Sequence, residues 1–246
     1  MPSWQLVVYV AGTLLLVGFV CLNSWAAAAL LRRQPLAYNP LLHPLENLGR
    51  LVLVGICLLL SRVSGLPDAA FGFVDPDPAA NLLLGVACGL VLLGLNHYGT
   101  RWVLRRWGAG TYAPALLRAM LPGSSREWLF AAPALLLAAL GEELLFRSLA
   151  LGGLAAFWPA LALAVVFSLA FGLAHLPQGK LGVVGAGLLG FLLSLLFLWR
   201  WSLLACTVAH LLVNLGQLYT GERELRWLER SAASNEGGIQ SPGGDV

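Results

Sequence analysis

Long apolar stretches follow one another along this chain and are separated by short polar segments. They cover residues 5–31, 48–66, 80–100, 125–150, 156–176, 181–199 and 202–219. A helix that crosses a bilayer needs about 20 predominantly apolar residues. The second stretch is the weakest candidate because Arg50 and Arg62 interrupt it, and residues 107–122 are expected to add a surface or re-entrant helix. The pattern predicts an all-α, polytopic transmembrane helical bundle of about six to eight spans.

The composition supports a membrane location. Of the 246 residues, 59% are hydrophobic and 11% are charged, and the mean hydropathy is +0.79. A soluble domain carries about a quarter charged residues. The net charge of +3 is small and the basic residues are scattered between apolar stretches, so no nucleic-acid partner is expected. We expect an integral, multi-pass membrane protein surrounded by the lipid bilayer.

Basic residues alternate between successive loops. Cytoplasmic loops carry an excess of arginine and lysine. The first and third loops are rich in arginine and are expected to be cytoplasmic, whereas the second carries three aspartates against Arg62. With seven spans, the N-terminus would lie outside and the tail inside. The arginines are Arg32, Arg33 and Arg50 in the first loop and Arg101, Arg105, Arg106, Arg118 and Arg126 in the third.

The chain divides into three regions. Residues 1–120 hold N-terminal helices and loops, residues 121–220 hold the later spans, and residues 221–246 form a polar tail. The tail is expected to be a short juxtamembrane helix followed by disorder. The first apolar stretch is too long for a signal peptide and is expected to be retained. One lysine against fourteen arginines, with abundant alanine, leucine and glycine, favours a GC-rich prokaryotic source and its plasma membrane.

The cysteines suggest no site of their own. Cys21, Cys57, Cys88 and Cys206 lie in separate apolar stretches without C-x-x-C spacing. Neither a disulfide framework nor a cysteine zinc site is expected, and the four side chains are interpreted as small buried hydrophobes.

Ionisable residues are unusual inside the fourth apolar stretch. Glu142 and Glu143 are adjacent there, and Arg147 follows Glu143 at i,i+4, which places both on one helical face. Glu142 points about 100° away, so only Glu143 is expected to pair with the arginine. Charged residues within a span are costly and mark functional sites by default. The free carboxylate of Glu142 is therefore the first candidate for chemistry.

Two further pairs have the same spacing in later stretches. Phe171 and His175 are at i,i+4, and so are His210 and Asn214. Taken singly, each pair has a structural explanation; Asn214, for instance, could hydrogen-bond a neighbouring helix. Their joint occurrence in three helices favours one site in a membrane-embedded cavity.

These residue types suit hydrolysis. A carboxylate and a histidine can deprotonate water, and a second histidine with an amide can stabilise the oxyanion that forms at a carbonyl. Nucleophilic catalysis by a serine or cysteine has less support. A divalent metal such as zinc stays open as an alternative, because Glu142, His175 and His210 make a catalytic zinc set. The HExxH signature of helical zinc sites is absent.

The three motifs, in their order, resemble a known family. Residues 142–147 read EExxxR, residues 171–175 read FxxxH and residues 210–214 read HxxxN. A glycine-rich stretch over 182–190 and a Trp-Ser-Leu turn at 201–203 add to the likeness. Over residues 125–219 the chain resembles the CPBP family of intramembrane proteases. That family includes the eukaryotic CAAX prenyl endopeptidases of the Rce1 type and the bacterial Abi and bacteriocin-processing or immunity-associated proteins.

The resemblance implies a membrane-embedded endopeptidase, with residues 121–220 as its catalytic core. Glu142 and His175 would activate water, and His210 and Asn214 would stabilise the oxyanion. The residues implied to support the site are Glu143, Arg147 and Phe171. The substrate would be a membrane-associated or lipidated protein or peptide, and the family is classed with metalloproteases.

The depths of the site residues conflict if every helix is straight. Glu142 lies well along its expected span, whereas His175 lies near the end of the next one. Their depths match only where a helix is short, tilted or broken, which glycines 152–153 and Pro159 allow. We predict an irregular connection there. Convergence of the Glu142, His175 and His210 side chains on one cavity is the structural test of the hypothesis.

Two other functions compete with proteolysis. A non-catalytic scaffold or regulator, such as an immunity-type protein, would keep the fold, because some members of the resembled family act on partners without evident proteolysis. A proton-coupled transporter would also use intramembrane glutamate, histidine and arginine, but the sequence shows no internal repeat. Replacing Glu142 by glutamine discriminates, because only hydrolysis depends on that carboxylate.

Overall fold

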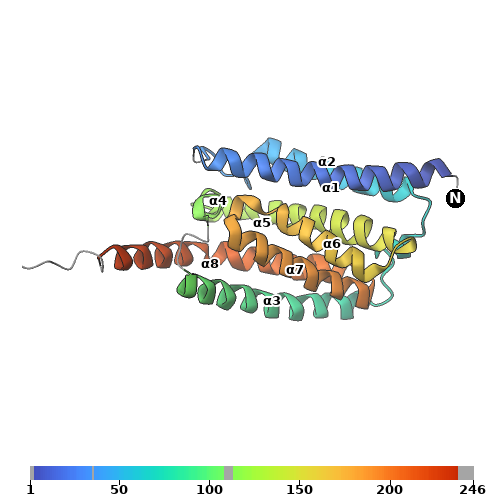
Figure 1. The fold of residues 1–246 in the computed structure, drawn as a ribbon. Helices are drawn as coiled ribbons and strands as arrows, with labels where there is room; N and C mark the ends of the chain where they lie inside the picture. The colour runs from blue at the N-terminus through green and yellow to red at the C-terminus, as the bar shows by residue number, and fades with distance from the viewer. Residues whose placement is uncertain (1–2, 35, 108–112, 238–246) are drawn as a thin grey trace, which may run out of the picture.

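A computed structural model describes residues 3–34, 36–107 and 113–237 of the chain (Figure 1). These residues form helices and no strand, as the apolar pattern predicted. The 3₁₀-helices are η1 (Asp68–Phe71), η4 (Leu154–Ala156) and η5 (Leu176–Gln178), and η3 (Leu144–Gly153) is a π-helix. The α-helices are α1 (Ser3–Leu31), α2 (Pro44–Val63), α3 (Pro78–Trp107), α4 (Pro114–Met120), α5 (Ser125–Glu143), α6 (Ala160–Leu173), α7 (Gly179–Arg200) and α8 (Leu203–Gly237).

The long helices lie side by side in one bundle. Six segments of the described chain are long and apolar enough to cross a membrane, and α6, with 14 residues, is shorter. Figure 1 shows α1 and α2 on one side and α3 on the opposite side, with α5 to α8 between them. The N-terminus and the end of α8 lie at opposite ends of the bundle. The predicted polytopic, multi-pass architecture is confirmed.

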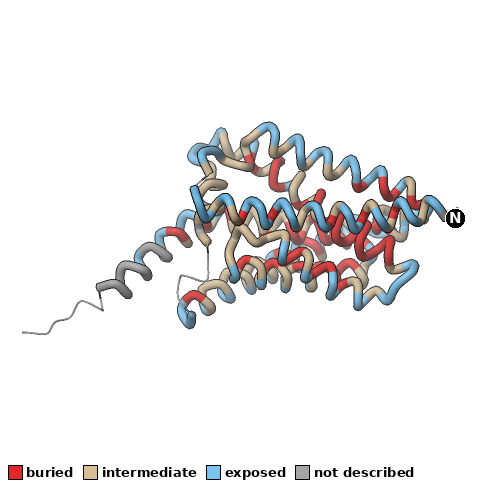
Figure 2. Tube along the Cα trace, turned by 45° about the horizontal axis from the view of Figure 1, so that its top comes forward, coloured by how far each residue is buried: buried red, intermediate tan, exposed pale blue. Residues whose placement is uncertain are grey.

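Burial singles out one span. In the most apolar window of each span, 50% of residues are buried for Ser125–Ala156 but only 17% for α1, α2 and α3. Figure 2 shows the buried residues gathered in the middle of the bundle. Large apolar side chains such as Leu15, Leu83 and Leu161 are exposed on its outside. The apolar outer surface is suited to contact with lipid. The span that carries Glu142 and Glu143 is the most buried one of the six.

The central span changes from α-helix to π-helix after Glu143, in the region where the sequence predicted an irregular connection. It starts at an N-cap, where Ser124 accepts a hydrogen bond from the Glu127 amide (3.3 Å). After Glu143 the chain continues as the π-helix η3 and the 3₁₀-helix η4, and Pro159 then precedes α6. The predicted irregular connection is confirmed. π-Helical turns are frequent at functional sites because the widened turn redirects side chains.

Tight packing fixes the end of this π-helix. The Tyr9 hydroxyl donates to the Leu149 carbonyl at 2.6 Å, and Ser148 donates to the Phe71 carbonyl at 2.7 Å. A Cβ atom at Gly153 would collide with the Tyr9 hydroxyl and with the Phe71 ring. Glycine at 153 therefore lets α1 and the loop after α2 close on η3.

The C-terminal region is helical where a short juxtamembrane helix was expected. Residues 221–237 continue α8 as one helix without a break. Glu224 lies 3.0 Å from His97 and 3.3 Å from Arg101 of α3, and these contacts hold the extension against the bundle. The predicted disorder of residues 238–246 lies outside the described residues. The expected surface helix within 107–122 is present as α4.

The cysteines make no disulfide within the described chain. Cys57 and Cys206 are buried, as expected, whereas Cys21 and Cys88 are partly exposed.

Candidate active site

Glu143 forms the fixed centre of a buried polar cluster. Its side chain is fully buried in the last turn of α5. One oxygen, Oε1, accepts from Arg147 Nη1 at 2.9 Å and from His210 Nδ1 at 2.7 Å. The pairing with Arg147 confirms the prediction from i,i+4 spacing. The contact with His210 joins α5 to α8 across 67 residues and was not foreseen.

Arg147 ties the cluster to two other helices. Its Nη2 donates to the Gly190 carbonyl of α7 at 3.0 Å. The guanidinium carbon lies 4.5 Å from the centre of the Phe171 ring of α6, within cation–π range. A Cβ atom at Gly190 would lie 3.0 Å from that ring, so glycine here permits the close approach. Phe171 thus contacts the Arg147 guanidinium within the cluster.

His175 presents one nitrogen to the site. Its Nδ1 lies 2.8 Å from the Phe171 carbonyl, and because a carbonyl only accepts, Nδ1 carries the hydrogen. In the neutral ring Nε2 then has a free lone pair. This nitrogen lies 3.9 Å from Glu142 Oε2.

His210 has the same arrangement. Its Nδ1 donates to Glu143, so Nε2 of the neutral ring also has a free lone pair. This Nε2 lies 3.8 Å from Glu142 Oε2. Glu143 therefore determines how the second histidine is presented to Glu142.

The side chains of Glu142, His175 and His210 converge, as the hypothesis required. Distances of 3.8–3.9 Å exceed the hydrogen-bond range. Glu142 Oε2 is buried and has no hydrogen-bond partner in the described part of the chain. The depths match because α6 has only 14 residues, or about 21 Å, and ends within the bundle. One carboxylate oxygen and two imidazole nitrogens thus face a common point.

Asn214 stands apart from this convergence. It follows His210 by one turn of α8 and is partly exposed. Its side chain makes no hydrogen bond within the described residues. The structure places it on the same helical face as His210 without joining it to the cluster.

Arg50 of α2 was missed as a candidate. It lies within electrostatic reach of Glu142 and of Glu46. From the sequence, Arg50 was interpreted as an interruption of a weak span and as one of the basic residues of the first loop. Its presence inside an apolar helix was itself the available signal, because an ionisable residue at that place is a functional candidate.

Glu142, His175 and His210 are residue types that bind zinc, but their facing atoms lie farther apart than zinc ligands do. In each histidine Nδ1 donates to an oxygen atom, as the second ring nitrogen of a metal-bound histidine usually does. Glu142 Oε2 has no hydrogen-bond partner in the described chain. Ligands across a tetrahedral zinc lie about 3.3 Å apart, which is less than the 3.8–3.9 Å found here. No group of three or more histidine, cysteine or acidic side chains in the described ranges has metal-site geometry as it stands. Loading a metal would require the three side chains to close slightly.

Comparison with known proteins agrees with the motifs. Residues 124–216 match the family described as Type II CAAX prenyl endopeptidase Rce1-like. The resemblance inferred from EExxxR, FxxxH and HxxxN is thereby confirmed over this segment, which spans α5 to the first half of α8. No curated protein and no solved structure gives a significant match. The protein is an integral multi-pass membrane protein whose residues 124–216 are similar to a family of CAAX-endopeptidase-like membrane proteins.

Proposed function

We propose that this protein is an intramembrane endopeptidase that hydrolyses a peptide bond with water activated by Glu142 and His175. The observation that carries the proposal is the convergence of Glu142 Oε2 with two imidazole Nε2 atoms at 3.8–3.9 Å. A water molecule hydrogen-bonded to the carboxylate and to an imidazole bridges such a separation. The family match over residues 124–216 supports the same chemistry.

The hydrolytic step follows from the free lone pairs. The water oxygen attacks the carbonyl carbon of the scissile bond while one water proton passes to Glu142 or to His175 Nε2. The carbonyl oxygen becomes an oxyanion. The same proton then passes to the amine as the C–N bond breaks, which yields a carboxylic acid and an amine. Glu143, Arg147 and His210 are buried, whereas the side chains of Glu142 and His175 are 29% and 17% exposed, so water can reach the two groups that activate it.

Stabilisation of the oxyanion places a condition on His210. Because its Nδ1 hydrogen is donated to Glu143, its Nε2 can donate to an oxyanion only when the ring carries a second proton. The amide of Asn214, which has no partner in the described chain, is the second proposed donor.

A divalent metal such as zinc is a variant of this proposal. Glu142, His175 and His210 would hold it, in line with the donor set above. When bound, it would polarise the scissile carbonyl and acidify the attacking water. Glu143 would keep His210 oriented in either case.

The expected substrate is a membrane-associated or lipidated protein or peptide in a prokaryotic plasma membrane. The test compares membranes that contain wild type or Glu142→Gln for peptides that accumulate uncleaved, by mass spectrometry. Glu222→Gln, at a side chain 70% exposed, is the matched control. Glu142→Gln is expected to reduce cleavage at least about a hundredfold, and Glu222→Gln to leave it unchanged. Identical peptide profiles in all three would favour a scaffold instead.

A further inference from the structure

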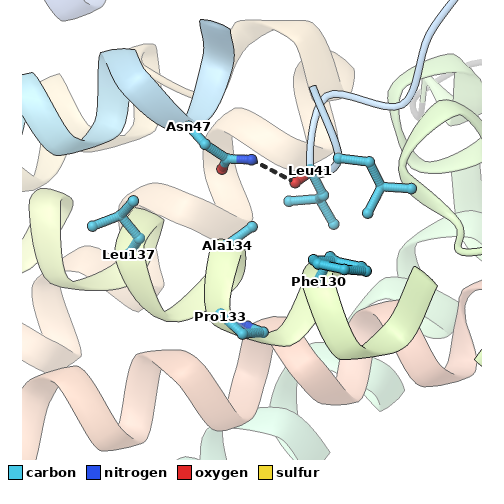
Figure 3. A pocket seen from close by; sticks show the side chains of 7 residues that line it. Leu41, Asn47, Phe130, Pro133, Ala134 and Leu137 are labelled. Atoms are coloured by element: carbon cyan, nitrogen blue, oxygen red, sulfur yellow. Dashed lines mark hydrogen bonds between the residues drawn. The ribbon is translucent and has the colours of Figure 1, made fainter. Parts of the chain in front are cut away.

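The two N-terminal helices meet the later helices in different ways. Between α2 and α5 lies an apolar pocket whose lining includes Leu41 and Phe130 (Figure 3). This pocket ends before Glu142, because Gly141 is buried and a Cβ atom there would lie 3.3 Å from the Leu53 side chain of α2. Helix α1 instead donates side-chain hydrogen bonds to backbone carbonyls of the helices that carry the site.

Two of these bonds from α1 reach the last turn of α6. The Cys21 thiol donates to the Ala170 carbonyl at 3.4 Å, and the Ser24 hydroxyl donates to the Leu173 carbonyl at 3.1 Å. Ser24 is buried, with 8% of its surface exposed. Helix α6 ends at Leu173, two residues before His175. The first helix therefore holds the part of α6 that leads into the histidine of the site.

The two bonds are not equivalent. The Ala170 carbonyl also accepts from the Ala174 amide at 2.9 Å, so the thiol only adds a second donor. The Leu173 carbonyl has no amide at i+4, because residue 177 is proline and lacks an N–H. Carbonyls at a helix end need a partner from outside the helix, and an unpaired one in apolar surroundings is costly. Ser24 thus supplies the donor that Pro177 lacks.

The chain after α6 forms a tight turn that orients His175. The His175 amide donates to the Gly172 carbonyl at 2.9 Å, which is at i−3, whereas an α-helix would use Phe171 at i−4. The Phe171 carbonyl accepts from Nδ1 of the same residue at 2.8 Å instead. That bond leaves Nε2 free on the side of Glu142. A contact that fixes the end of α6 therefore acts on the direction and the tautomer of this ring.

We propose that Ser24 is a positioning residue of the site, whose hydrogen bond to the Leu173 carbonyl fixes the end of α6 and so keeps His175 Nε2 directed at Glu142. Its effect on cleavage rests on the proposed peptidase function, whereas its effect on the ring does not. Ser24 lies outside residues 124–216, which match the family. The first helix thus completes a site whose reacting groups all lie in later helices.

The direct test is the state of the His175 ring in the full chain, in lipid nanodiscs and without substrate. Nitrogen-15 NMR of histidine-labelled protein separates protonated from unprotonated ring nitrogens, and His175→Gln identifies the signals. At a pH at which the ring is neutral, wild type is expected to carry the hydrogen on Nδ1 alone. Ser24→Ala is expected to show a mixture that includes hydrogen on Nε2, and Ser24→Thr, which keeps the hydroxyl, to restore the wild-type signals. Unchanged His175 signals in Ser24→Ala would overturn the proposal, whatever the activity.

Cleavage gives the second readout, with a peptide identified by its accumulation in Glu142→Gln membranes. Ser24→Ala is expected to lower kcat roughly five- to tenfold with KM nearly unchanged, as the loss of one hydrogen bond provides. Ser24→Thr should recover most of the rate. Cys21→Ala is the matched control on the same helix and should keep the wild-type kcat, because Ala170 retains its amide donor. An equal fall in kcat for Ser24→Ala and Cys21→Ala would contradict the proposal, since it would indicate a general loosening of α1.

The two readouts separate this inference from the peptidase itself. A mixed His175 spectrum in Ser24→Ala, together with no cleavage by wild type, would refute the peptidase and support the positioning role. Cleavage by wild type with the same His175 spectrum in both proteins would do the reverse. Thermal unfolding of each variant in detergent shows that the compared proteins are folded.

Discussion

Two polar networks of this bundle differ in whether their polar atoms all have hydrogen-bond partners. At one end, Asp75 accepts hydrogen bonds from Asn81 and Ser202 at 2.6 Å each, and Arg200 donates to Asn81 at 2.7 Å. In the middle, Glu142 and Glu143 meet histidines and an arginine. The first network joins the loop before α3 to the turn between α7 and α8. The second joins α5, η3, α6, α7 and α8.

The difference lies in the atoms without partners. Both oxygens of Asp75 are hydrogen-bonded. In the central cluster, Oε2 of Glu142, Oε2 of Glu143 and Nε of Arg147 are buried without a partner in the described chain. Buried polar atoms in native proteins are nearly always satisfied, and exceptions require an explanation. A network whose polar atoms are all hydrogen-bonded stabilises a turn, whereas polar atoms without partners are available to bind water, metal or substrate.

Breaking the central network is expected to have the largest effect on stability. Glu143→Gln leaves Arg147 buried without a counter-charge and is expected to cost about 3–5 kcal/mol. It should also reduce activity, because His210 loses the carboxylate that orients it. Thermal unfolding in detergent measures the first effect and peptide cleavage the second.

The double variant Glu143→Gln, Arg147→Met sharpens this expectation. Removing both charges should recover part of the lost stability without recovering activity. Additive losses would show that the two residues do not act as a pair.

Breaking the peripheral network is expected to have a smaller and purely structural effect. Asp75→Asn removes a charged acceptor of two side-chain hydrogen bonds and is expected to cost about 1–2 kcal/mol, since the group is partly solvated. Activity per folded molecule should be unchanged. The control Asp68→Asn removes an exposed pair and should cost less than about 1 kcal/mol. A fall in kcat for Asp75→Asn would contradict the purely structural role assigned to the peripheral network.

The smallest expected effect is a pH dependence of the peripheral network. Burial raises the pKa of Asp75, but hydrogen bonds from Ser202 and Asn81 outweigh it and hold the pKa below its ordinary value of 3.8. A carboxylate with a lowered folded-state pKa stabilises the protein above pH 3.8, and this contribution is lost as the pH falls through the folded value. The difference in Tm between wild type and Asp75→Asn should therefore shrink below that pH. A constant difference would contradict the assignment.

Much of the fold could be predicted because hydropathy and spacing are local properties. The apolar stretches located the spans, and i,i+4 spacing paired Glu143 with Arg147 at 2.9 Å. The glycines and proline after the central span predicted its irregular connection. A short helix after the last span was expected, but the contacts of Glu224 with α3 that hold it against the bundle are not visible in a local pattern.

By itself, the sequence determined a polytopic helical bundle and the residues that share each helical face, because period and apolar length depend on neighbours along the chain. Only the tertiary structure decided which residues meet. Three features depend on helices brought together in space: the contact of His210 with Glu143, the free Nε2 atoms near Glu142, and the nearness of Arg50 to Glu142. The physical reason is that the tautomer of a histidine and the satisfaction of a buried charge are set by the atoms that surround them. Those atoms come from segments as far apart as α2 and α8.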